Sequence, residues 1–211
     1  MRDIPVFSTE NGIASLIFRE IPYRGEAYIT LQDTKEPEKF LKECVDFCKA
    51  VGADKIFATG HEFLNKFPIF SVIYQMEIPK ADIKCSEAKL IQVSSNTIDQ
   101  WRDLHNKRMI AVPNAATITL TDANELMKSG SAYYIQLGKE TIGLGVAEGD
   151  TVKSVISLKH GYGHDVVCAL SNALDAEIIK LEVASTNTRA VDLYKRLGFI
   201  ETKECKRWFL V

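Results

Sequence analysis

The sequence lacks any long apolar run, because Lys, Arg, Asp or Glu interrupts every hydrophobic stretch before the roughly 18 residues that a membrane span needs. It also lacks an excess of charge, since 26 Lys and Arg stand against 28 Asp and Glu, a net charge of −2. This balance excludes a protein that holds nucleic acid or anionic lipid through its overall charge, so we expect neither nucleic acid nor membrane as a partner. Residues 1–5 lack the apolar core of a signal peptide, which indicates a cytoplasmic protein.

Cysteine is scarce, with five residues at irregular positions: Cys44, Cys48, Cys85, Cys168 and Cys205. This odd count argues against a disulfide framework, and no Cys-x-x-Cys or His-rich motif indicates a zinc site, so no metal cofactor is expected. Cys44 and Cys48 lie one helical turn apart, a spacing that also suits a metal clamp. Because they continue an apolar stripe at helical spacing, we predict that both are core residues.

The remaining composition is that of a globular protein: 211 residues, 46% of them hydrophobic and 26% charged, enough for one large or two small domains. A less apolar segment at 79–87 is the best boundary. Before it, hydrophobic period and turn residues predict strands at 12–21 and 26–32, a helix at 37–51, and strands at 54–59 and 69–78.

The second part of the chain alternates strands and helices. The expected elements are helices at 97–109 and 122–128, strands at 132–137, 141–146 and 152–158, a helix at 162–174, a strand at 177–183, a helix at 188–197 and a last strand that ends at 211. Asp122 and Glu125 resemble a capping box, and His105 falls on the apolar face of the first helix. Strand, helix and strand at this spacing predict parallel pairing with a right-handed crossover.

Two glycines stand where the strand 152–158 meets the following helix, in Gly161-Tyr162-Gly163. Glycines let the backbone turn tightly with its N–H groups outward, and a helix N-terminus favours an anion, so a phosphate fits this junction. Lys159, His160 and His164 add basic groups, whereas Asp165 repels an anion. A tight turn with solvated histidines remains an alternative, since neither a Walker pattern nor Gly-x-Gly-x-x-Gly is present.

The clearest motif lies at 181–199, where Leu-Glu-Val is followed by Asn187, Ala190, a Leu-Tyr pair and Gly198-Phe199. On these residues the chain resembles the GNAT superfamily of acyl-CoA-dependent N-acetyltransferases. The spacing of Glu, Asn and Tyr is similar to that of the ribosomal-protein alanine acetyltransferases. The resemblance implies an α/β (α+β) fold with a mixed, twisted, predominantly antiparallel sheet flanked by helices.

The resemblance also implies that acetyl-CoA is the co-substrate, held on the loop between strand and helix. Backbone amides of the splayed strand would align the pantetheine and polarise the thioester. The superfamily's usual Arg or Gln three residues before the first Gly is here Leu158. The expected acetyl-CoA-binding residues are Val155, Ile156, Ser157, Lys159, His160, Gly161, Tyr162, Gly163, His164 and Asn187.

Two side chains are candidate catalytic residues. From the pattern alone, Tyr194 on an apolar helix face is equally a core residue, but the resemblance implies that it protonates the departing CoA thiolate. Glu182 faces away from the apolar side of its strand and is either a solvated carboxylate or, by the resemblance, the base that deprotonates the amine. Glu148 and Asp150 are alternative bases, as is a water molecule.

These observations predict a degenerate GNAT-like N-terminal half at 1–85 and a GNAT acetyltransferase domain at 86–211. The expected reaction is direct acetyl transfer to a primary amine, of a small molecule or a peptide N-terminus, in a ternary complex. A catalytically silent acyl-CoA-binding sensor or assembly domain is the alternative. A nucleotide-binding domain of unrelated function would leave residues 187–199 unexplained. The sequence leaves open the acceptor, any contribution of the N-terminal half to its binding, and the oligomeric state.

Overall fold

A computed structural model describes residues 5–84 and 86–211, so the predictions for residues 1–4 and Cys85 lie outside it. The chain divides into unit 1, which runs through Val72 and includes Lys206–Val211, and unit 2, Ile73–Cys205. The division falls within two strands, β5 (Ile69–Pro79) and β11 (Ile200–Leu210), rather than at the expected position 85. The reason is that β11 pairs with a strand of unit 1 and β5 with a strand of unit 2.

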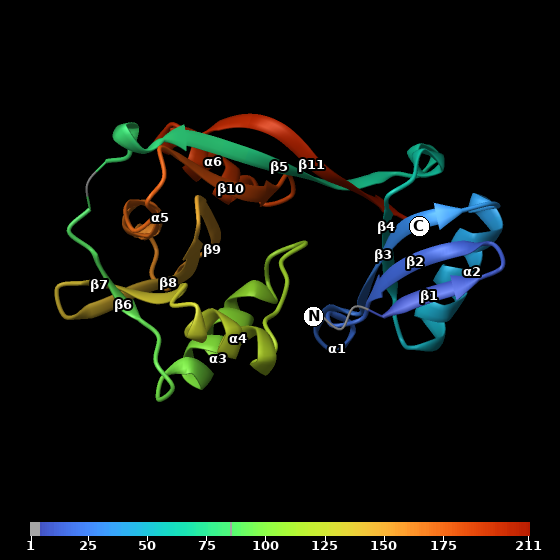
Figure 1. Ribbon diagram of the computed structural model, residues 1–211, viewed down its shortest axis with the longest axis horizontal. Helices are drawn as coiled ribbons and strands as arrows, with labels where there is room; N and C mark the ends of the chain where they lie inside the picture. The colour runs from blue at the N-terminus through green and yellow to red at the C-terminus, as the bar shows by residue number, and fades with distance from the viewer. Residues whose placement is uncertain (1–4, 85) are drawn as a thin grey trace. The chain divides into compact units, whose positions relative to one another are not determined.

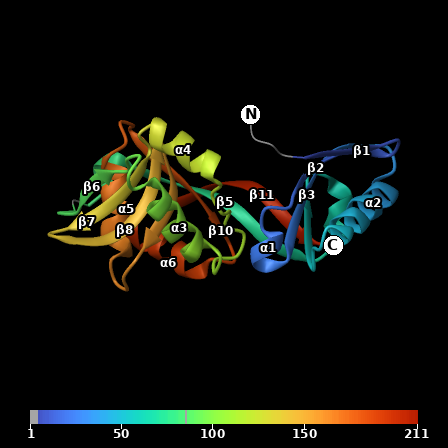
Figure 2. The ribbon, with the colours of Figure 1, turned by 90° about the horizontal axis from the view of Figure 1, so that it is seen from below.

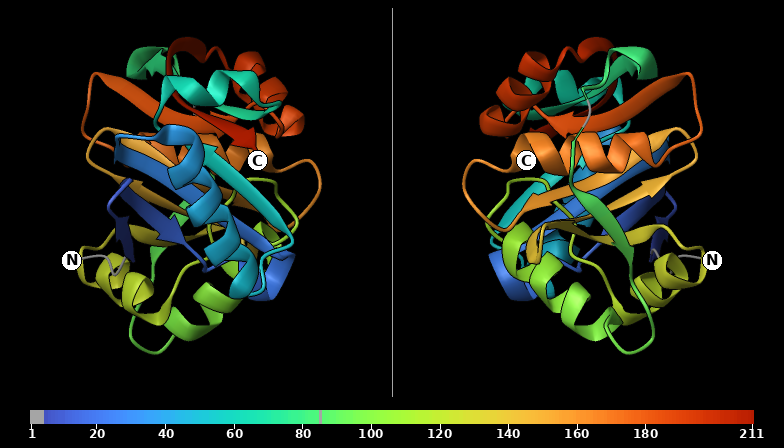
Figure 3. Two further views of the ribbon diagram at one scale, coloured as in Figure 1. Left: turned by 90° about the vertical axis from the view of Figure 1, so that its right-hand side faces the viewer. Right: turned by 90° about the vertical axis from the view of Figure 1, so that its left-hand side faces the viewer.

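Unit 1 is a small sheet with one covering helix. Its elements are β1 (Val6–Thr9), β2 (Gly12–Ile17), α1 (Ile21–Arg24), β3 (Glu26–Thr34), α2 (Pro37–Ala50), β4 (Lys55–Thr59) and η1 (Glu62–Lys66). The strand order is β1-β2-β3-β4-β11, and only β3 and β4 run parallel. Helix α2 lies across one face of these strands (Figures 2 and 3). It buries Phe40, Cys44 and Cys48, so the prediction that both cysteines are core residues is confirmed.

Unit 2 holds the larger sheet, in the order β11-β5-β10-β9-β8-β7-β6. Its further elements are η2 (Lys80–Asp82), β6 (Lys89–Gln92), α3 (Ile98–Met109), α4 (Leu120–Lys128), β7 (Ala132–Leu137), β8 (Glu140–Glu148), β9 (Thr151–Ser157), α5 (Gly163–Asn172), β10 (Ile178–Ala184) and α6 (Thr188–Leu197) (Figure 1). The predicted parallel pairing across α5 is confirmed, because β9 and β10 run parallel. The pairs β6–β7, β7–β8, β8–β9 and β5–β10 are antiparallel.

Helices cover both faces of this sheet. Helices α5 and α6 enclose one apolar core, and α3 and α4 enclose the other (Figures 1 and 3). Gly143 and Gly145 of β8 let α5 lie directly on the strand, because a Cβ at either position would come within 2.4 Å of Val166 or Leu170. No helix in the described part of the chain is long and apolar enough to cross a membrane.

Several local predictions need correction. The capping box of α4 is formed by Thr119 and Asp122, not by Asp122 and Glu125, because the helix begins two residues earlier than expected. The sequence predicts a turn between strands at residues 22–25, but residues 22–24 belong to the short helix α1, and Gly25 follows as its C-cap at a φ of +67°. Strands β1 and β6 were not predicted, because four residues carry too little hydrophobic pattern to be recognised.

Candidate active site

The two central parallel strands of unit 2 separate part-way along their length. β9 and β10 pair only near their beginnings, through Lys180↔Thr151 and Leu181↔Val152. Beyond these positions β9 remains paired with β8, and β10 with β5. The backbone edge of residues 153–157 that faces β10 therefore has no strand partner. Unpaired backbone N–H and C=O groups are costly unless another group satisfies them, so this edge is suited to an extended ligand that lies along β9.

The loop after β9 leads from this opening into α5. Gly161 has a φ of +94°, which a residue with a side chain rarely adopts, and a Cβ there would meet no atom within 4 Å. Tyr162 is the N-cap residue and provides no side-chain cap, so the first N–H groups of α5 have no intrahelical acceptor. Gly163 lies against α6, since its Cβ would come within 2.9 Å of Leu193. These free donors and the positive end of the helix dipole fit an anion.

The charges around this loop partly cancel. The Lys159 ammonium forms an ion pair with Glu140 on β8, and Asp165 lies in the first turn of α5. His160 is exposed and His164 is half-buried. The side chains of the loop therefore contribute less positive charge than the sequence predicts, and the helix N-terminus is its main attraction for an anion.

Side chains of β9 are occupied with packing, which leaves its backbone for a ligand. Val155 packs against the core beneath α5 and α6, and Ile156 is buried in the core beneath α3 and α4. The Ser157 hydroxyl donates to the carbonyl oxygen of Lys159 and so shapes the start of the loop. The contribution of these three residues to ligand binding is thus expected through N–H and C=O groups.

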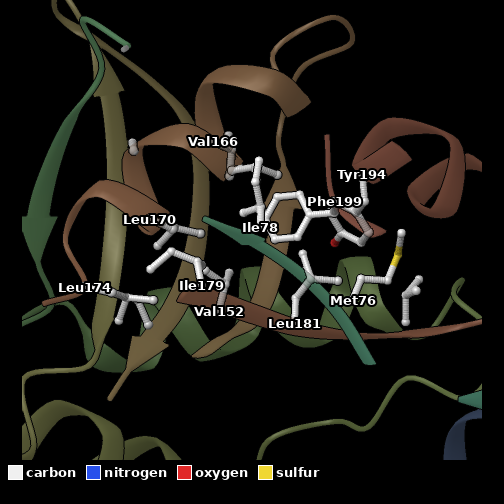
Figure 4. Close-up of a cluster of buried hydrophobic side chains, with 14 of the residues drawn as sticks. Met76, Ile78, Val152, Val166, Leu170, Leu174, Ile179, Leu181, Tyr194 and Phe199 are labelled. Atoms are coloured by element: carbon white, nitrogen blue, oxygen red, sulfur yellow. The ribbon is translucent and has the colours of Figure 1, made fainter. Parts of the chain in front are cut away.

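Helix α6 has the boundaries that its sequence predicts. The Asn187 side chain accepts a hydrogen bond from the N–H of Ala190 at 3.3 Å, and Gly198 ends the helix at a φ of +98°. Tyr194 lies in the apolar core with 7% of its surface exposed, 5.9 Å from the ring of Phe199 (Figure 4). Burial raises the pKa of Tyr194, so the phenol keeps its proton at neutral pH.

Glu182 lies on the other face of the sheet. Its neighbours Leu181 and Val183 join the core that contains Tyr194, whereas Glu182 is exposed. The pKa of the Cys205 thiol on β11 is raised, mainly by burial and then by the nearby Glu182 carboxylate. The two candidate catalytic side chains therefore lie on opposite faces of the sheet.

The alternative bases are both engaged in ion pairs at the beginning of β9. Asp150 contacts Lys180 at 2.7 Å and accepts from the Thr151 hydroxyl at 2.6 Å, and the hydrogen bond from Lys180 holds the pKa of Asp150 below its ordinary value. Glu148 pairs with Lys153. Within residues 5–84 and 86–211, no group of three or more His, Cys, Asp and Glu side chains is placed to hold a metal ion.

His105 forms a buried contact between α3 and β9 that the sequence indicated only as part of an apolar face. The ring is 1% exposed, with Nε2 at 3.3 Å from the Ser154 hydroxyl and Nδ1 at 3.2 Å from Asn106 Oδ1. The Asn106 amide also exchanges two hydrogen bonds with the backbone of Ile118 in the loop before α4. This network joins that loop to the strand that lines the opening. Burial lowers the pKa of His105 to about 4.

We expect this histidine to make unfolding pH-dependent. Its pKa lies near 6.5 in the unfolded chain and about 4 in the folded one, so the unfolded state binds more protons between these values. Stability is then full above pH 6.5 and falls by up to about 1.4 kcal/mol per pH unit as the pH drops toward 4. Urea unfolding from pH 7 to 4.5 should show a shallower fall for His105→Gln than for wild type. The control His160→Gln, at an exposed position, should follow wild type, and identical slopes in all three proteins would contradict the prediction.

Several proteins of known structure share this architecture. Residues 157–208 match the model of the FR47-like protein family, and no curated protein sequence matches the chain. A conserved protein of unknown function from Staphylococcus epidermidis aligns over 99% of this chain and 93% of its own, at 14% identity and a TM-score of 0.58. A GCN5-related N-acetyltransferase from Sphaerobacter thermophilus aligns over 94% and 75%, at 11% identity and a TM-score of 0.57. A GNAT-family acetyltransferase from Colwellia psychrerythraea aligns over 97% and 84%, at 13% identity and a TM-score of 0.51.

The chain has the GNAT fold. The fold that the resemblance of residues 181–199 implies, a mixed, mostly antiparallel sheet flanked by helices, is confirmed. The closer similarity to ribosomal-protein alanine acetyltransferases is not confirmed and stays a prediction. The family-model match begins at the last residue of β9 and contains the glycine loop, α5, β10 and α6, so it covers most of the candidate GNAT site.

Proposed function

We propose that this GNAT protein is an N-acetyltransferase that moves the acetyl group of acetyl-CoA to a primary amine within a ternary complex. The observation that carries the proposal is the opening between β9 and β10 beside the N-terminus of α5. An extended thioester arm needs free backbone donors along a narrow passage, and a pyrophosphate needs the N–H groups of a helix N-terminus. Both features lie within residues 153–165.

The chemistry requires a base, an acid and alignment of the two substrates. The amine nitrogen attacks the thioester carbonyl carbon, so that a C–N bond forms and the C–S bond breaks. Glu182 takes the surplus proton of the amine, and the phenol of Tyr194 gives its proton to the departing thiolate. After the amide and CoA leave, the proton on Glu182 returns to Tyr194 through solvent. Bringing both substrates together supplies much of the rate, because the reaction becomes effectively intramolecular.

The two faces of the sheet support this division of roles. Tyr194 lies on the apolar face of the sheet, where a neutral phenol with a raised pKa is a proton donor at neutral pH. Glu182 lies on the exposed side, where an amine can reach it from solvent. The acceptor amine is then expected on the Glu182 face, and the CoA thiol in the opening. Its identity, a small molecule or a peptide N-terminus, is not specified by these two groups.

Glu182 is preferred over Asp150 because of where each carboxylate lies. Asp150 precedes the part of β9 that is paired with β10, and its ion pair with Lys180 makes it a weaker base. Glu148 lies before the same closed end and pairs with Lys153. Glu182 directly follows Leu181, the last residue of β10 that pairs with β9.

We also propose that unit 1 is a reduced copy of the same GNAT plan. In unit 1, helix α2 connects the parallel strands β3 and β4, and the antiparallel strand β11 lies next to β4 in the sheet. In unit 2, helix α5 connects the parallel strands β9 and β10, and the antiparallel strand β5 lies next to β10 in the sheet. Each unit thus completes its sheet with a strand that comes from the opposite half of the sequence.

Unit 1 is expected to bind no acyl-CoA. The loop before α2 has no glycine, its N-cap residue Glu36 carries a negative charge, and Pro37 removes one N–H donor from the first turn. A hollow of about 770 Å³ does lie beside α2 and η1, and its lining includes Lys39, Lys42 and Lys66. All three ammonium groups, however, lie within 4 Å of a carboxylate. We propose a structural role for this unit.

A screen of amines, amino acids and peptide N-termini, with release of free thiol from acetyl-CoA as the readout, tests the proposed function. Thiol release that depends on one class of amine is the expected result. Tight CoA binding without turnover on any amine would instead favour a catalytically silent sensor or assembly domain. No binding of CoA would overturn both.

Calorimetric titration with CoA should give one site per chain, located at the glycine loop. His160→Glu adds a carboxylate beside the expected phosphates and should weaken binding by roughly 5-fold to 10-fold, because a like charge within one Debye length is repelled. The control Asn96→Glu adds the same charge just before the N-terminus of α3, at an exposed position outside the glycine loop, and should leave the affinity unchanged. Two sites per chain, or equal effects of the two variants, would contradict the site assignment.

A further inference from the structure

An arginine from a distant part of the sequence reaches the glycine loop. Arg108 belongs to the last turn of α3, yet its Nη2 donates a hydrogen bond to the carbonyl oxygen of Leu158 at 2.9 Å. Leu158 is the residue between β9 and the loop, and Arg108 itself is exposed. A guanidinium carries five N–H donors in a fixed plane. One contact with a carbonyl therefore fixes its position while most of its donors stay available.

The loop needs a cation that its own residues do not supply. Leu158 is apolar, the ammonium of Lys159 is paired with Glu140, and Asp165 adds a negative charge at the helix N-terminus. Arg108, in contrast, has no carboxylate within ion-pair distance in the described part of the chain. Since a guanidinium stays protonated at all physiological pH values, Arg108 brings a full positive charge to the beginning of this loop.

We infer that Arg108 binds a phosphate group of the acyl-CoA substrate, an assignment that rests on the proposed function. Guanidinium and phosphate form paired, charge-assisted hydrogen bonds, and Arg suits this contact better than Lys because its donors are planar and spaced for two oxygens. The hydrogen bond to Leu158 couples the guanidinium to the strand end from which the loop departs. Arg108 is thus a binding residue for the phosphates and takes no part in the acyl transfer itself.

Removal of the phosphates from the donor separates this role from a structural one. Acetyl-pantetheine carries the same thioester as acetyl-CoA but no phosphate and no nucleotide. Arg108→Gln should raise the Kd for CoA and the KM for acetyl-CoA by roughly 10-fold, which is the scale of a charge-assisted contact. The KM for acetyl-pantetheine and the kcat should stay unchanged. Arg108→Lys should recover only part of the affinity, because it restores the charge without the planar pair of donors. The matched control is Lys107→Ala, which removes one exposed positive charge from the same turn and should leave both donors unaffected.

Each outcome supports or overturns the assignment. Calorimetry gives the Kd without any turnover, and thermal unfolding shows whether Arg108→Gln is folded. An equal loss with both donors would mean that Arg108 only shapes the loop, and an unchanged Kd for CoA would remove it from the site. If Arg108→Gln binds CoA as well as the wild-type protein does, only the Arg108 assignment is overturned. Wild-type protein that binds no CoA overturns the proposed function with it.

Discussion

Tyr194→Phe is expected to lower kcat by about 100-fold or more, the scale on which a lost general acid acts. The phenol is buried in the core with Met76 and Phe199, and burial raises its pKa, so it is protonated whenever the thiolate leaves. Phe keeps the ring and its packing and deletes only the proton donor. Stability should therefore change little, and the KM for acetyl-CoA should stay close to that of wild type.

Single-turnover kinetics with a saturating amine would measure this effect on the chemical step itself. The control is Tyr133→Phe, which removes a hydroxyl from a half-buried tyrosine that packs against the same core. Full activity in Tyr133→Phe together with a slow Tyr194→Phe would identify the phenol of Tyr194 as the acid. Equal rates in Tyr194→Phe and wild type would show that Tyr194 is a core residue without a chemical role.

Glu182→Gln should lower the rate by a similar factor, roughly 100-fold, because the amide has the shape of the carboxylate but cannot take the proton of the amine. Glu182 is exposed on the face opposite to Tyr194, so the change should cost little stability. The expected signature is in the pH–rate profile, since an amine that loses its proton to solvent requires a higher pH. Raising the pH should therefore recover part of the activity of Glu182→Gln.

Two isosteric variants distinguish Glu182 from the other carboxylates. Asp150→Asn and Glu148→Gln each break an ion pair at the beginning of β9, and both should keep most of the activity. Loss of activity in either of them, with an active Glu182→Gln, would move the base to that position. Activity in all three variants would mean that a water molecule accepts the proton.

The sequence was most informative where structure depends on neighbours in the chain. The side chain of Asn187 and the left-handed conformation of Gly198 act within one turn of α6, so both ends of this helix were predicted to the residue. The strand, helix, strand order of β9, α5 and β10 also followed from hydrophobic period and length, because a parallel connection needs a crossover helix. The glycine loop was visible for the same reason, since its backbone requirement is local.

The tertiary structure alone decided how the site is assembled. The separation of β9 from β10 beyond Val152 depends on which strands stay paired on either side. The pairing of β5 with β10 and of β11 with β4 joins residues roughly 100 to 150 positions apart in the sequence. The contact of Arg108 with Leu158 has the same origin, because no local pattern relates a helix end to a loop 50 residues later. Hydrophobic period and capping report the preferences of a short segment, whereas strand exchange and long-range hydrogen bonds are selected by the packing of the whole chain.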